Sequence, residues 1–161
     1  LKYKDKKSEL ESDLGLVQSS WEHTEDVKEM LEERLIPRLV KNKTQLIFNS
    51  IWLAIDKRKN VIVADFGIKG NPVSNISNDG INEIEIGYGT MPQFQGNGYM
   101  TEAVGGFVKW AFERSDIDLI LANTDKNNFA SIKVLEKNEF EKFNENENEF
   151  CWRKNVAGKL I

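Results

Sequence analysis

The order of apolar patterns along the chain predicts a mixed α/β domain, of the α/β or α+β class. Two observations support this fold class. Apolar residues recur at helical spacing in well-separated segments, and short β-prone runs, one of them strictly alternating, lie between and after those segments. The chain has 161 residues, of which 40% are hydrophobic, and this suits one compact core. We therefore expect a single domain over residues 1–161.

The first quarter of the chain predicts helices. Residues 1–12 are charged and compatible with a helix. Thr24 is a suitable N-cap for a second helix that we expect to run to about Lys41, with a kink or break at Pro37. Apolar residues recur along this helix at helical spacing, so one of its faces should pack on the domain.

Strands and helices alternate through the rest of the chain. A polar loop is expected from Gly70 to Gly80, and Pro92 follows the end of the alternating strand. Gly105 and Gly106 interrupt the next helix, which suggests close packing there. The expected strands cover residues 46–55, 61–68, 81–88, 117–122, 140–143 and 149–153. The expected helices run from just after Gly98 to about Arg114 and over 129–138.

Composition and charge disfavour several classes of function. The formal charge of -4 and the pI of about 5.2 give no basic field for phosphate backbones, so nucleic acid is not expected as a main partner. Cys151 is the single cysteine, so no internal disulfide or cysteine-based zinc site is expected, which suits a reducing cytoplasm. No apolar run approaches the roughly 20 residues of a membrane span. We expect a cytoplasmic protein with no metal and no membrane contact.

The segment Glu85–Ala103 predicts a strand that leads through a glycine-rich loop into a helix. Glycines let the backbone approach a phosphate closely, and the first N–H groups of a helix point toward such an anion. A Gly-x-Gly loop, here Gly96 and Gly98, can equally serve only to turn the chain. The lysine of a P-loop and the full Rossmann fingerprint are missing from this segment, so other nucleotide-binding motifs fit poorly.

Two motifs in this chain resemble those of GNAT N-acetyltransferases, in particular the branch that acetylates alanine or serine N-termini of ribosomal proteins. In the first motif, the strand Glu85–Tyr88 and the loop Pro92–Gly98 precede the helix start Tyr99–Ala103. The second motif is Thr124–Ser131, which has an Asn-x-x-Ser pattern and is followed by a closing Phe140. Two motifs in the family's order and at its spacing are far more specific than either motif alone.

The resemblance runs from Trp21 to about Arg153 and implies the GNAT fold, a splayed, mostly antiparallel sheet flanked by helices. Acetyl-CoA would be wedged between strands 81–88 and 117–122. The family's first strand is expected ahead of Leu1, unless another element fills that edge. The residues that the resemblance assigns to acetyl-CoA are Tyr88, Gly89, Thr90, Gln95, Gly96, Asn97, Gly98, Tyr99, Met100, Thr101 and Asn128.

The resemblance also divides these residues among the parts of the cofactor. Tyr88–Thr90 would contact the pantetheine arm and help polarise the thioester carbonyl. Backbone N–H groups of Gly96–Thr101 would hold the pyrophosphate, and Asn128 would hydrogen-bond the pantetheine.

Acetyl transfer by direct attack of a neutral amine needs a base, a stabiliser for the oxyanion and help for the departing thiolate. The resemblance implies Glu85 as the base, with a solvated strand carboxylate as the alternative. Glu83 points to the same face, so either carboxylate could serve as the base. The resemblance implies Ser131 as the support of the thiolate, with a local helix cap as the alternative. The side chain of Tyr88 is expected in the core or lining the pocket. His23, the single histidine, is expected to cap a helix or lie at the pocket rim.

Several positions depart from the family's pattern. Asn97 replaces a commonly basic residue, which leaves the phosphates to backbone dipoles and to lysines such as Lys133 or Lys126. Leu135 replaces the acidic tyrosine of many relatives, so the tyrosine-acid mechanism is not expected here. Three further positions also differ: Met100 where glycine or alanine is usual, Asn123 in place of a glutamate, and Glu139 in place of a glycine.

These features predict an acetyl-CoA-dependent N-acetyltransferase that acts on a primary amine. The acceptor stays open, because the branch suggests a protein N-terminus whereas an acidic surface would also suit a polyamine, an aminoglycoside or another cationic amine. The alternative is a non-catalytic acyl-CoA-binding sensor or partner-binding domain, which Met100, Asn123 and Leu135 would fit. A homodimer is compatible with the sequence.

Overall fold

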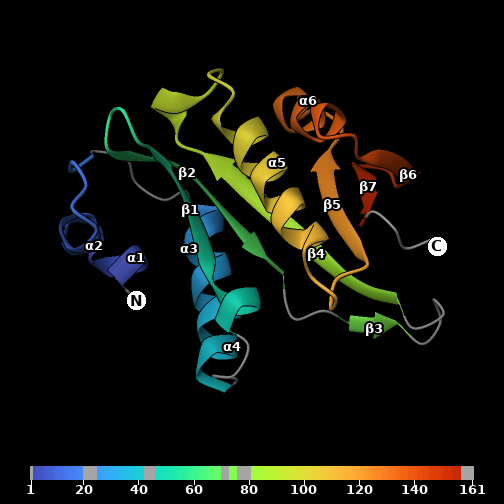
Figure 1. The fold of residues 1–161 in the computed structure, drawn as a ribbon, viewed down its shortest axis with the longest axis horizontal. Coiled ribbons are helices and arrows are strands. Elements are labelled where there is room, and N and C mark those ends of the chain that lie inside the picture. Colours follow the sequence, from blue (N-terminus) through green and yellow to red (C-terminus); the bar gives the residue numbers. More distant parts are fainter. Residues whose placement is uncertain (1, 20–24, 42–45, 70–72, 76–80, 157–161) are drawn as a thin grey trace.

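The described chain folds as a mixed sheet with helices packed against it (Figure 1). The computed structural model describes residues 2–19, 25–41, 46–69, 73–75 and 81–156. The strands are β1 Ile51–Asp56, β2 Val61–Ile68, β3 Val73–Asn75, β4 Ile81–Thr90, β5 Leu119–Asp125, β6 Glu141–Glu145 and β7 Glu149–Asn155. Their order is β1-β2-β4-β5-β7-β6, with β3 also paired to β4. β4 and β5 are parallel and the other described pairs are antiparallel, which confirms the mixed, mostly antiparallel sheet.

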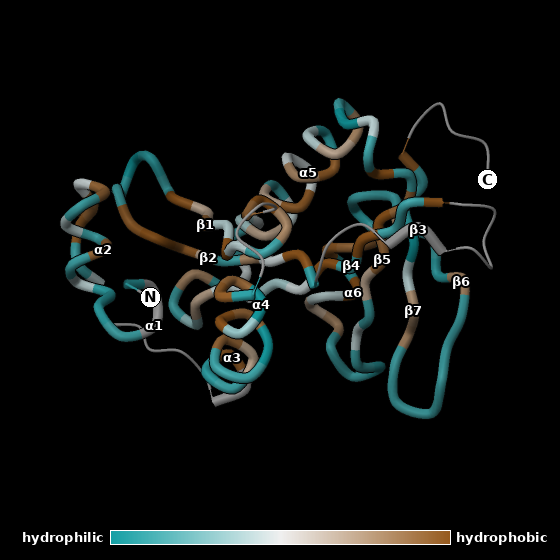
Figure 2. The backbone as a smooth tube through the Cα atoms, turned by 90° about the horizontal axis from the view of Figure 1, so that it is seen from below, coloured by the Kyte–Doolittle hydropathy of each residue, from teal (hydrophilic) through white to brown (hydrophobic). Residues whose placement is uncertain are grey.

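The helices form layers on both sides of this sheet. They are α1 Lys2–Asp5, α2 Lys7–Asp13, α3 Glu25–Glu29, the π-helix η1 Met30–Leu35, α4 Ile36–Lys41, the 3₁₀ helices η2 Leu46–Asn49 and η4 Pro92–Phe94, α5 Tyr99–Phe112 and α6 Phe129–Lys137. Figure 2 shows α5 on one side of β1 and β2 and α3 with α4 on the other, and it shows the β6–β7 end as strongly hydrophilic. The helix face built on Leu31 and Leu35 covers Ile62 and Met91 in a small core of its own.

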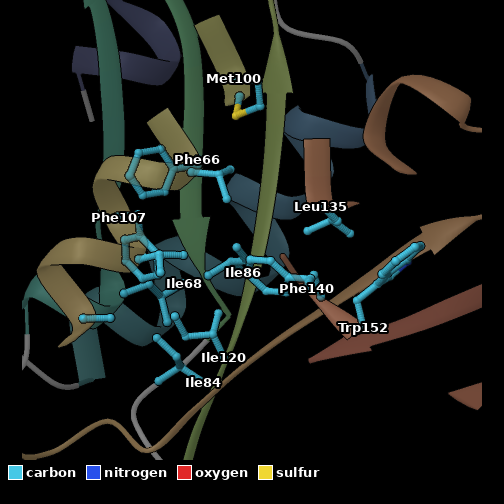
Figure 3. Close-up of a cluster of buried hydrophobic side chains, with 14 of the residues drawn as sticks. Phe66, Ile68, Ile84, Ile86, Met100, Phe107, Ile120, Leu135, Phe140 and Trp152 are labelled. Carbon is cyan, nitrogen blue, oxygen red and sulfur yellow. The ribbon is translucent and has the colours of Figure 1, made fainter. Parts of the chain in front are cut away.

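The main core lies between the sheet and helices α5 and α6. Phe66 of β2, Ile86 of β4 and Phe107 of α5 are buried in it. Figure 3 shows Leu135 of α6 in the same cluster as Phe140. Burying each of these large apolar side chains stabilises the fold by roughly 1.5–3 kcal/mol relative to leaving it exposed. The core therefore holds α5 and α6 in place against the sheet.

The helix predicted up to Lys41 continues through Pro37, so of the predicted kink or break the structure contradicts the break. The chain changes to a π-helix over Met30–Leu35, and the Ile36 N–H donates to the carbonyl of Leu31, five residues back. Proline cannot donate a hydrogen bond and its ring crowds the carbonyl four residues earlier. A wider turn just before the proline relieves that crowding, which explains the continuous helix.

Two predicted boundaries in the first half of the chain also differ from the structure. The apolar run at 46–55 begins as the 3₁₀ helix η2, and β1 starts only at Ile51. The segment expected to be a loop over 70–80 contains the short strand β3, which pairs with β4 through Val73 and Glu83.

Gly105 brings α5 close to the end of α6. A Cβ atom at Gly105 would lie 2.9 Å from Oδ1 of Asn138, whose Nδ2 donates to the carbonyls of Thr101 (3.1 Å) and Val134 (2.9 Å). Close packing is therefore confirmed at Gly105. It is wrong for Gly106, where a Cβ would meet no described atom within 4 Å.

The sheet forks between β4 and β5. The two strands pair from Glu83 with Leu119 to Ile86 with Ala122, and beyond that point neither continues to pair with the other. β4 nevertheless runs on to Thr90, paired with β2 on its other edge, and β5 runs on paired with β7. This fork is the splay that the sequence predicted between these strands, and it leaves one edge of β4 open.

Candidate active site

A cleft of about 710 Å³ opens at the fork of β4 and β5. Four segments surround it: the end of β4, the loop after it, the start of α5 and one face of α6. The lining residues are Tyr88, Gly89, Thr90, Phe94, Gln95, Gly96, Gly98, Tyr99, Met100, Thr101, Asn128, Phe129, Ala130, Ser131, Lys133, Val134 and Lys137. The structure thus gathers in one cleft every residue that the sequence assigned to the cofactor, with the exception of Asn97.

The loop before α5 presents backbone N–H groups to the cleft. Gly96 and Gly98 have φ values of 77° and 82°, a region that favours glycine, and Gly98 occupies the N-cap position of α5. No described side chain caps α5, so its first N–H groups point out of the helix toward the cleft. The Asn97 amide donates to the carbonyls of Phe94 and Gln95, so this side chain shapes the loop rather than lining the cleft.

A polar contact joins β4 to α6 across the cleft. The hydroxyl of Tyr88 lies 2.9 Å from Oγ of Ser131. Asn128 is the N-cap of α6, and its Oδ1 accepts from the N–H of Ser131 at 3.0 Å. The side chain that caps α6 is thus that of Asn128 and not that of Ser131, whose hydroxyl faces Tyr88. The role of Ser131 toward the departing thiolate stays a prediction. Tyr88 is partly buried against the main core and lines the cleft, as the sequence predicted.

The open edge of β4 offers backbone groups of alternate residues. The Met91 N–H donates to the Val63 carbonyl in β2 at 3.0 Å, so the backbone groups of Met91 and, two residues earlier, Gly89 face β2. Backbone groups alternate between the two edges of a strand, so those of Tyr88 and Thr90 face the cleft. The donors at this edge are thus the N–H groups on either side of Gly89.

Glu85 lies outside the cleft lining, on the opposite face of β4 from Tyr88. Its side chain is 31% exposed and is ion-paired with Lys69, whose Nζ lies 2.5 Å from Oε1. Nδ2 of Asn123 donates to the same oxygen at 3.2 Å. Glu85 opposes Leu121 just before the fork, whereas Glu83 lies two residues further from it. Of the two carboxylates, Glu85 is therefore the one next to the cleft.

Positive charge reaches the cleft from α6. Lys133 and Lys137 are four residues apart, so they lie on one face of the helix, and both line the cleft. Phe129, four residues before Lys133, lines it as well and is 68% exposed. The described lining residues include no carboxylate. Lys126 is elsewhere, 3.7 Å from a carboxylate oxygen of Glu145, so only the first of the two lysines named from the sequence lies at the cleft.

The structure shows the surroundings or backbone conformation of three residues that depart from the family's pattern. Met100 is buried in the main core, so the core accommodates the bulk of its side chain. Leu135 is fully buried and offers no polar group to the cleft. Glu139 adopts a φ of 57°, the left-handed conformation that a glycine would take without strain.

Sequence reasoning missed two cations near the site. Lys137 could have been found from its helical spacing to Lys133, but Lys69 reaches Glu85 only through the pairing of β2 with β4. His23 and Thr24 lie outside the described residues, so the helix cap or pocket-rim position of His23 and the N-cap role of Thr24 stay predictions.

The described residues show neither a cluster of metal ligands nor a helix suited to a membrane. Within 2–19, 25–41, 46–69, 73–75 and 81–156, no group of three or more His, Cys, Asp or Glu side chains is arranged to hold a metal ion. Across the same residues, no helix has the length and apolar character that a membrane crossing requires.

Comparison with known sequences gives one family and two bacterial relatives. The family model described as "Acetyltransferase (GNAT) domain" matches residues 10–141. The chain is 34% identical over 99 residues to the "Uncharacterized N-acetyltransferase YjdG" of Bacillus subtilis (strain 168), covering 62% of this chain and 55% of that protein. It is 33% identical over 88 residues to the "Uncharacterized protein YkkB" of the same organism, covering 55% and 48%. The chain thus spans about half the length of the curated relatives it matches.

Solved structures share the fold at low sequence identity. The ribosomal-protein-S5-alanine acetyltransferase of Vibrio fischeri aligns with a TM-score of 0.64 and 19% identity, over 92% of this chain and 84% of that one. The N-acetyltransferase PseH of Campylobacter jejuni aligns with a TM-score of 0.61 and 15% identity, over 95% and 92%. PseH in complex with acetyl coenzyme A aligns with a TM-score of 0.56 and 17% identity, over 83% and 84%. These alignments confirm the predicted fold.

Proposed function

Because this chain belongs to the GNAT acetyltransferase family, we propose that it transfers the acetyl group of acetyl-CoA to a primary amine by direct attack on the thioester. The main support is the cleft at the fork. Lys133 and Lys137 line it and its described lining residues include no carboxylate, although the whole chain carries a formal charge of -4. A site with this local charge suits a phosphorylated ligand.

The loop and the first turn of α5 would hold the pyrophosphate. The uncapped N–H groups in the first turn of α5 lie at the cleft, and the helix dipole favours negative charge there. Lys133 and Lys137 would supply the positive charge that Asn97 does not. Phe129, exposed beside them, would cover an apolar or aromatic part of the same ligand.

The pantetheine arm would pair with the open edge of β4 as an added strand. Tyr88 and Thr90 turn their backbone groups to that edge, and an amide-bearing chain can bond to such groups. The Tyr88 N–H would then also be near the thioester carbonyl and stabilise its developing oxyanion. Asn128 would act mainly by capping α6 and so fixing the position of Ser131.

Glu85 would take the proton of the attacking amine from the other face of the sheet. Both described contacts of its carboxylate go to Oε1, so Oε2 would be the oxygen that accepts the proton. The thiolate that leaves would accept a hydrogen bond from the Tyr88–Ser131 pair. Burial raises the pKa of Tyr88 to about 12, so this phenol stays protonated and acts as a hydrogen-bond donor rather than as a source of protons.

A second candidate function is a non-catalytic acyl-CoA sensor. Two observations favour it. The carboxylate of Glu85, the proposed base, is engaged in an ion pair with Lys69, and the buried Leu135 offers no acidic group.

Cytoplasmic location and a homodimer stay predictions from the sequence.

One pair of variants separates these two functions. Acetyl-CoA binding is measured by calorimetry, and amine-dependent thiol release is measured with peptides, polyamines and aminoglycosides. Glu85→Gln should lower kcat by at least about 100-fold and leave the Kd of acetyl-CoA unchanged. Glu83→Gln, two residues further from the fork, is the matched control and should behave as wild type.

The alternatives give different results in the same assays. Tight acetyl-CoA binding with no thiol release for any amine supports the sensor. No acetyl-CoA binding overturns both functions, because each depends on the cleft.

A further inference from the structure

Lys69 is held against the proposed base by the pairing of β2 with β4. Lys69 directly follows the last residue of β2, and its N–H donates to the Glu85 carbonyl at 2.7 Å. The two residues are therefore cross-strand neighbours. A Cβ atom at Gly87 would lie 3.2 Å from Cε of Lys69. The missing side chain at Gly87 therefore leaves the space in which the lysine chain lies along β4.

The ammonium of Lys69 lies on the face from which an acceptor would approach. It contacts Oε1 of Glu85, and Nδ2 of Asn123 donates to the same atom. Asn123 is the first residue of β5 after its pairing with β4 ends at Ala122. The Lys69, Glu85 and Asn123 side chains thus form one cluster at the fork, which we call the acceptor cluster, on the face opposite Tyr88.

A positive charge at this position has two effects on an amine acceptor. It repels acceptors that carry further ammonium groups, and it favours the neutral form of the amine that attacks. An α-amino group with a pKa of about 7.7–8.0 is about one-third neutral near pH 7.5, whereas only about one in a thousand alkyl ammonium groups with a pKa near 10.4 is neutral. Both effects favour a weakly basic α-amine that carries no second ammonium nearby.

We propose that Lys69 is a specificity-determining residue that selects a peptide α-amine over polycationic amines as the acetyl acceptor. This role presupposes the acetyl transfer proposed above and narrows its substrate class. The acidic composition of the chain favours polycations at long range, but the described groups of the acceptor cluster are one ammonium, one carboxylate and one amide. The local charge next to Glu85 is therefore balanced, and a cationic acceptor would have to displace Lys69.

The test compares two acceptors in wild type and three variants. The acceptors are a pool of tripeptides that covers all twenty first residues, and spermidine. The variants are Lys69→Met, which removes the charge and keeps the chain length, Lys69→Arg, which keeps the charge, and Lys109→Met, an exposed lysine on α5 as control. The measured quantity is the ratio of kcat/KM for the peptide pool to kcat/KM for spermidine, with the Kd of acetyl-CoA determined in parallel.

Wild type, Lys69→Arg and Lys109→Met should favour the peptide pool, and Lys69→Met should lower the ratio roughly tenfold, since solvent screens part of the exposed charge. Comparing the ratio between variants cancels the intrinsic basicity of the two acceptors. A wild type that favours spermidine, or an unchanged ratio in Lys69→Met, overturns the proposed selection. Failure to acetylate any peptide overturns it too. The binding of acetyl-CoA and the turnover of spermidine then decide separately whether acetyl transfer itself still stands.

Discussion

The hydroxyl oxygen of Tyr88 lies 2.9 Å from Oγ of Ser131, so a hydrogen bond ties β4 to the first turn of α6 across the cleft. Two elements that are more than forty residues apart in the sequence are held together at the point where the sheet forks. Because the phenol is partly buried against the main core, we expect the stability of the fold and the chemistry proposed for the cleft to depend on this contact.

The burial of Tyr88 predicts a specific dependence of stability on pH. Burial raises the pKa of Tyr88 from 10.0 to about 12 in the folded protein. The stabilisation is therefore fully present below pH 10 and is lost as the pH rises through about 12. Between these values the free energy of unfolding should fall by up to roughly 3 kcal/mol more in wild type than in Tyr88→Phe. Urea unfolding across this range measures the difference, and parallel curves for both proteins would contradict it.

The contact between the two hydroxyls should appear as a coupling energy. Tyr88→Phe and Ser131→Ala should each lower the free energy of unfolding by about 0.5–1.5 kcal/mol. The double variant should lose less than the sum, since either single change already removes the hydrogen bond. Urea unfolding of the four proteins measures the coupling, and strictly additive losses would show that the two hydroxyls act independently.

The lysines on α6 should strengthen the binding of thioesters that carry phosphate groups and leave the binding of other thioesters unchanged. Lys133→Ala and Lys137→Ala should each raise the Kd of acetyl-CoA roughly three- to fivefold, since each removes one exposed charge from the cleft. Calorimetry with acetyl-CoA and with S-acetyl-pantetheine, which lacks phosphate, measures the effect. Lys126→Ala is the control, because Lys126 pairs with Glu145 away from the cleft. Equal losses for the two thioesters would contradict the assignment.

The two neighbouring glycines of α5 should respond in opposite ways to alanine. Gly106→Ala should raise the free energy of unfolding by about 0.5–1 kcal/mol, because a Cβ there meets no described atom. Gly105→Ala should lower it by about 1–2 kcal/mol, because the Cβ displaces the Asn138 amide from its two carbonyl partners. Thermal or urea unfolding measures both changes, and equal responses would show that α6 does not press on α5 at Gly105.

Local patterns in the sequence predict most of this fold. The alternation of β4 around Ile84 and Ile86 and the apolar stripe of α5 are direct consequences of one buried face, and both elements lie where they were predicted. The apolar run at 46–55 is different, since a short apolar run suits a 3₁₀ turn as well as a strand. β3 has three residues and exists through its partner β4, which no local pattern reveals.

The candidate site was predictable where residues are close in sequence. The loop and helix start around Gly96 and Gly98 carry a recognisable motif, and the structure brings them to one cleft with Ser131. The contact of Lys69 with Glu85 depends on strand register, and that of Tyr88 with Ser131 depends on how α6 packs. Contacts of this kind follow from tertiary structure, so the sequence alone gives the residue types without their partners.

At the fork, β4 has an unpaired backbone edge in the middle of the sheet. A ligand can therefore be recognised there by main-chain groups. A ligand that pairs with the backbone of Tyr88 and Thr90 uses groups that every residue except proline carries. Side chains along this part of β4 can then be exchanged without loss of those bonds. In the same way, the role proposed for Lys69 could change with its side chain while the main-chain groups that would hold the cofactor stay the same.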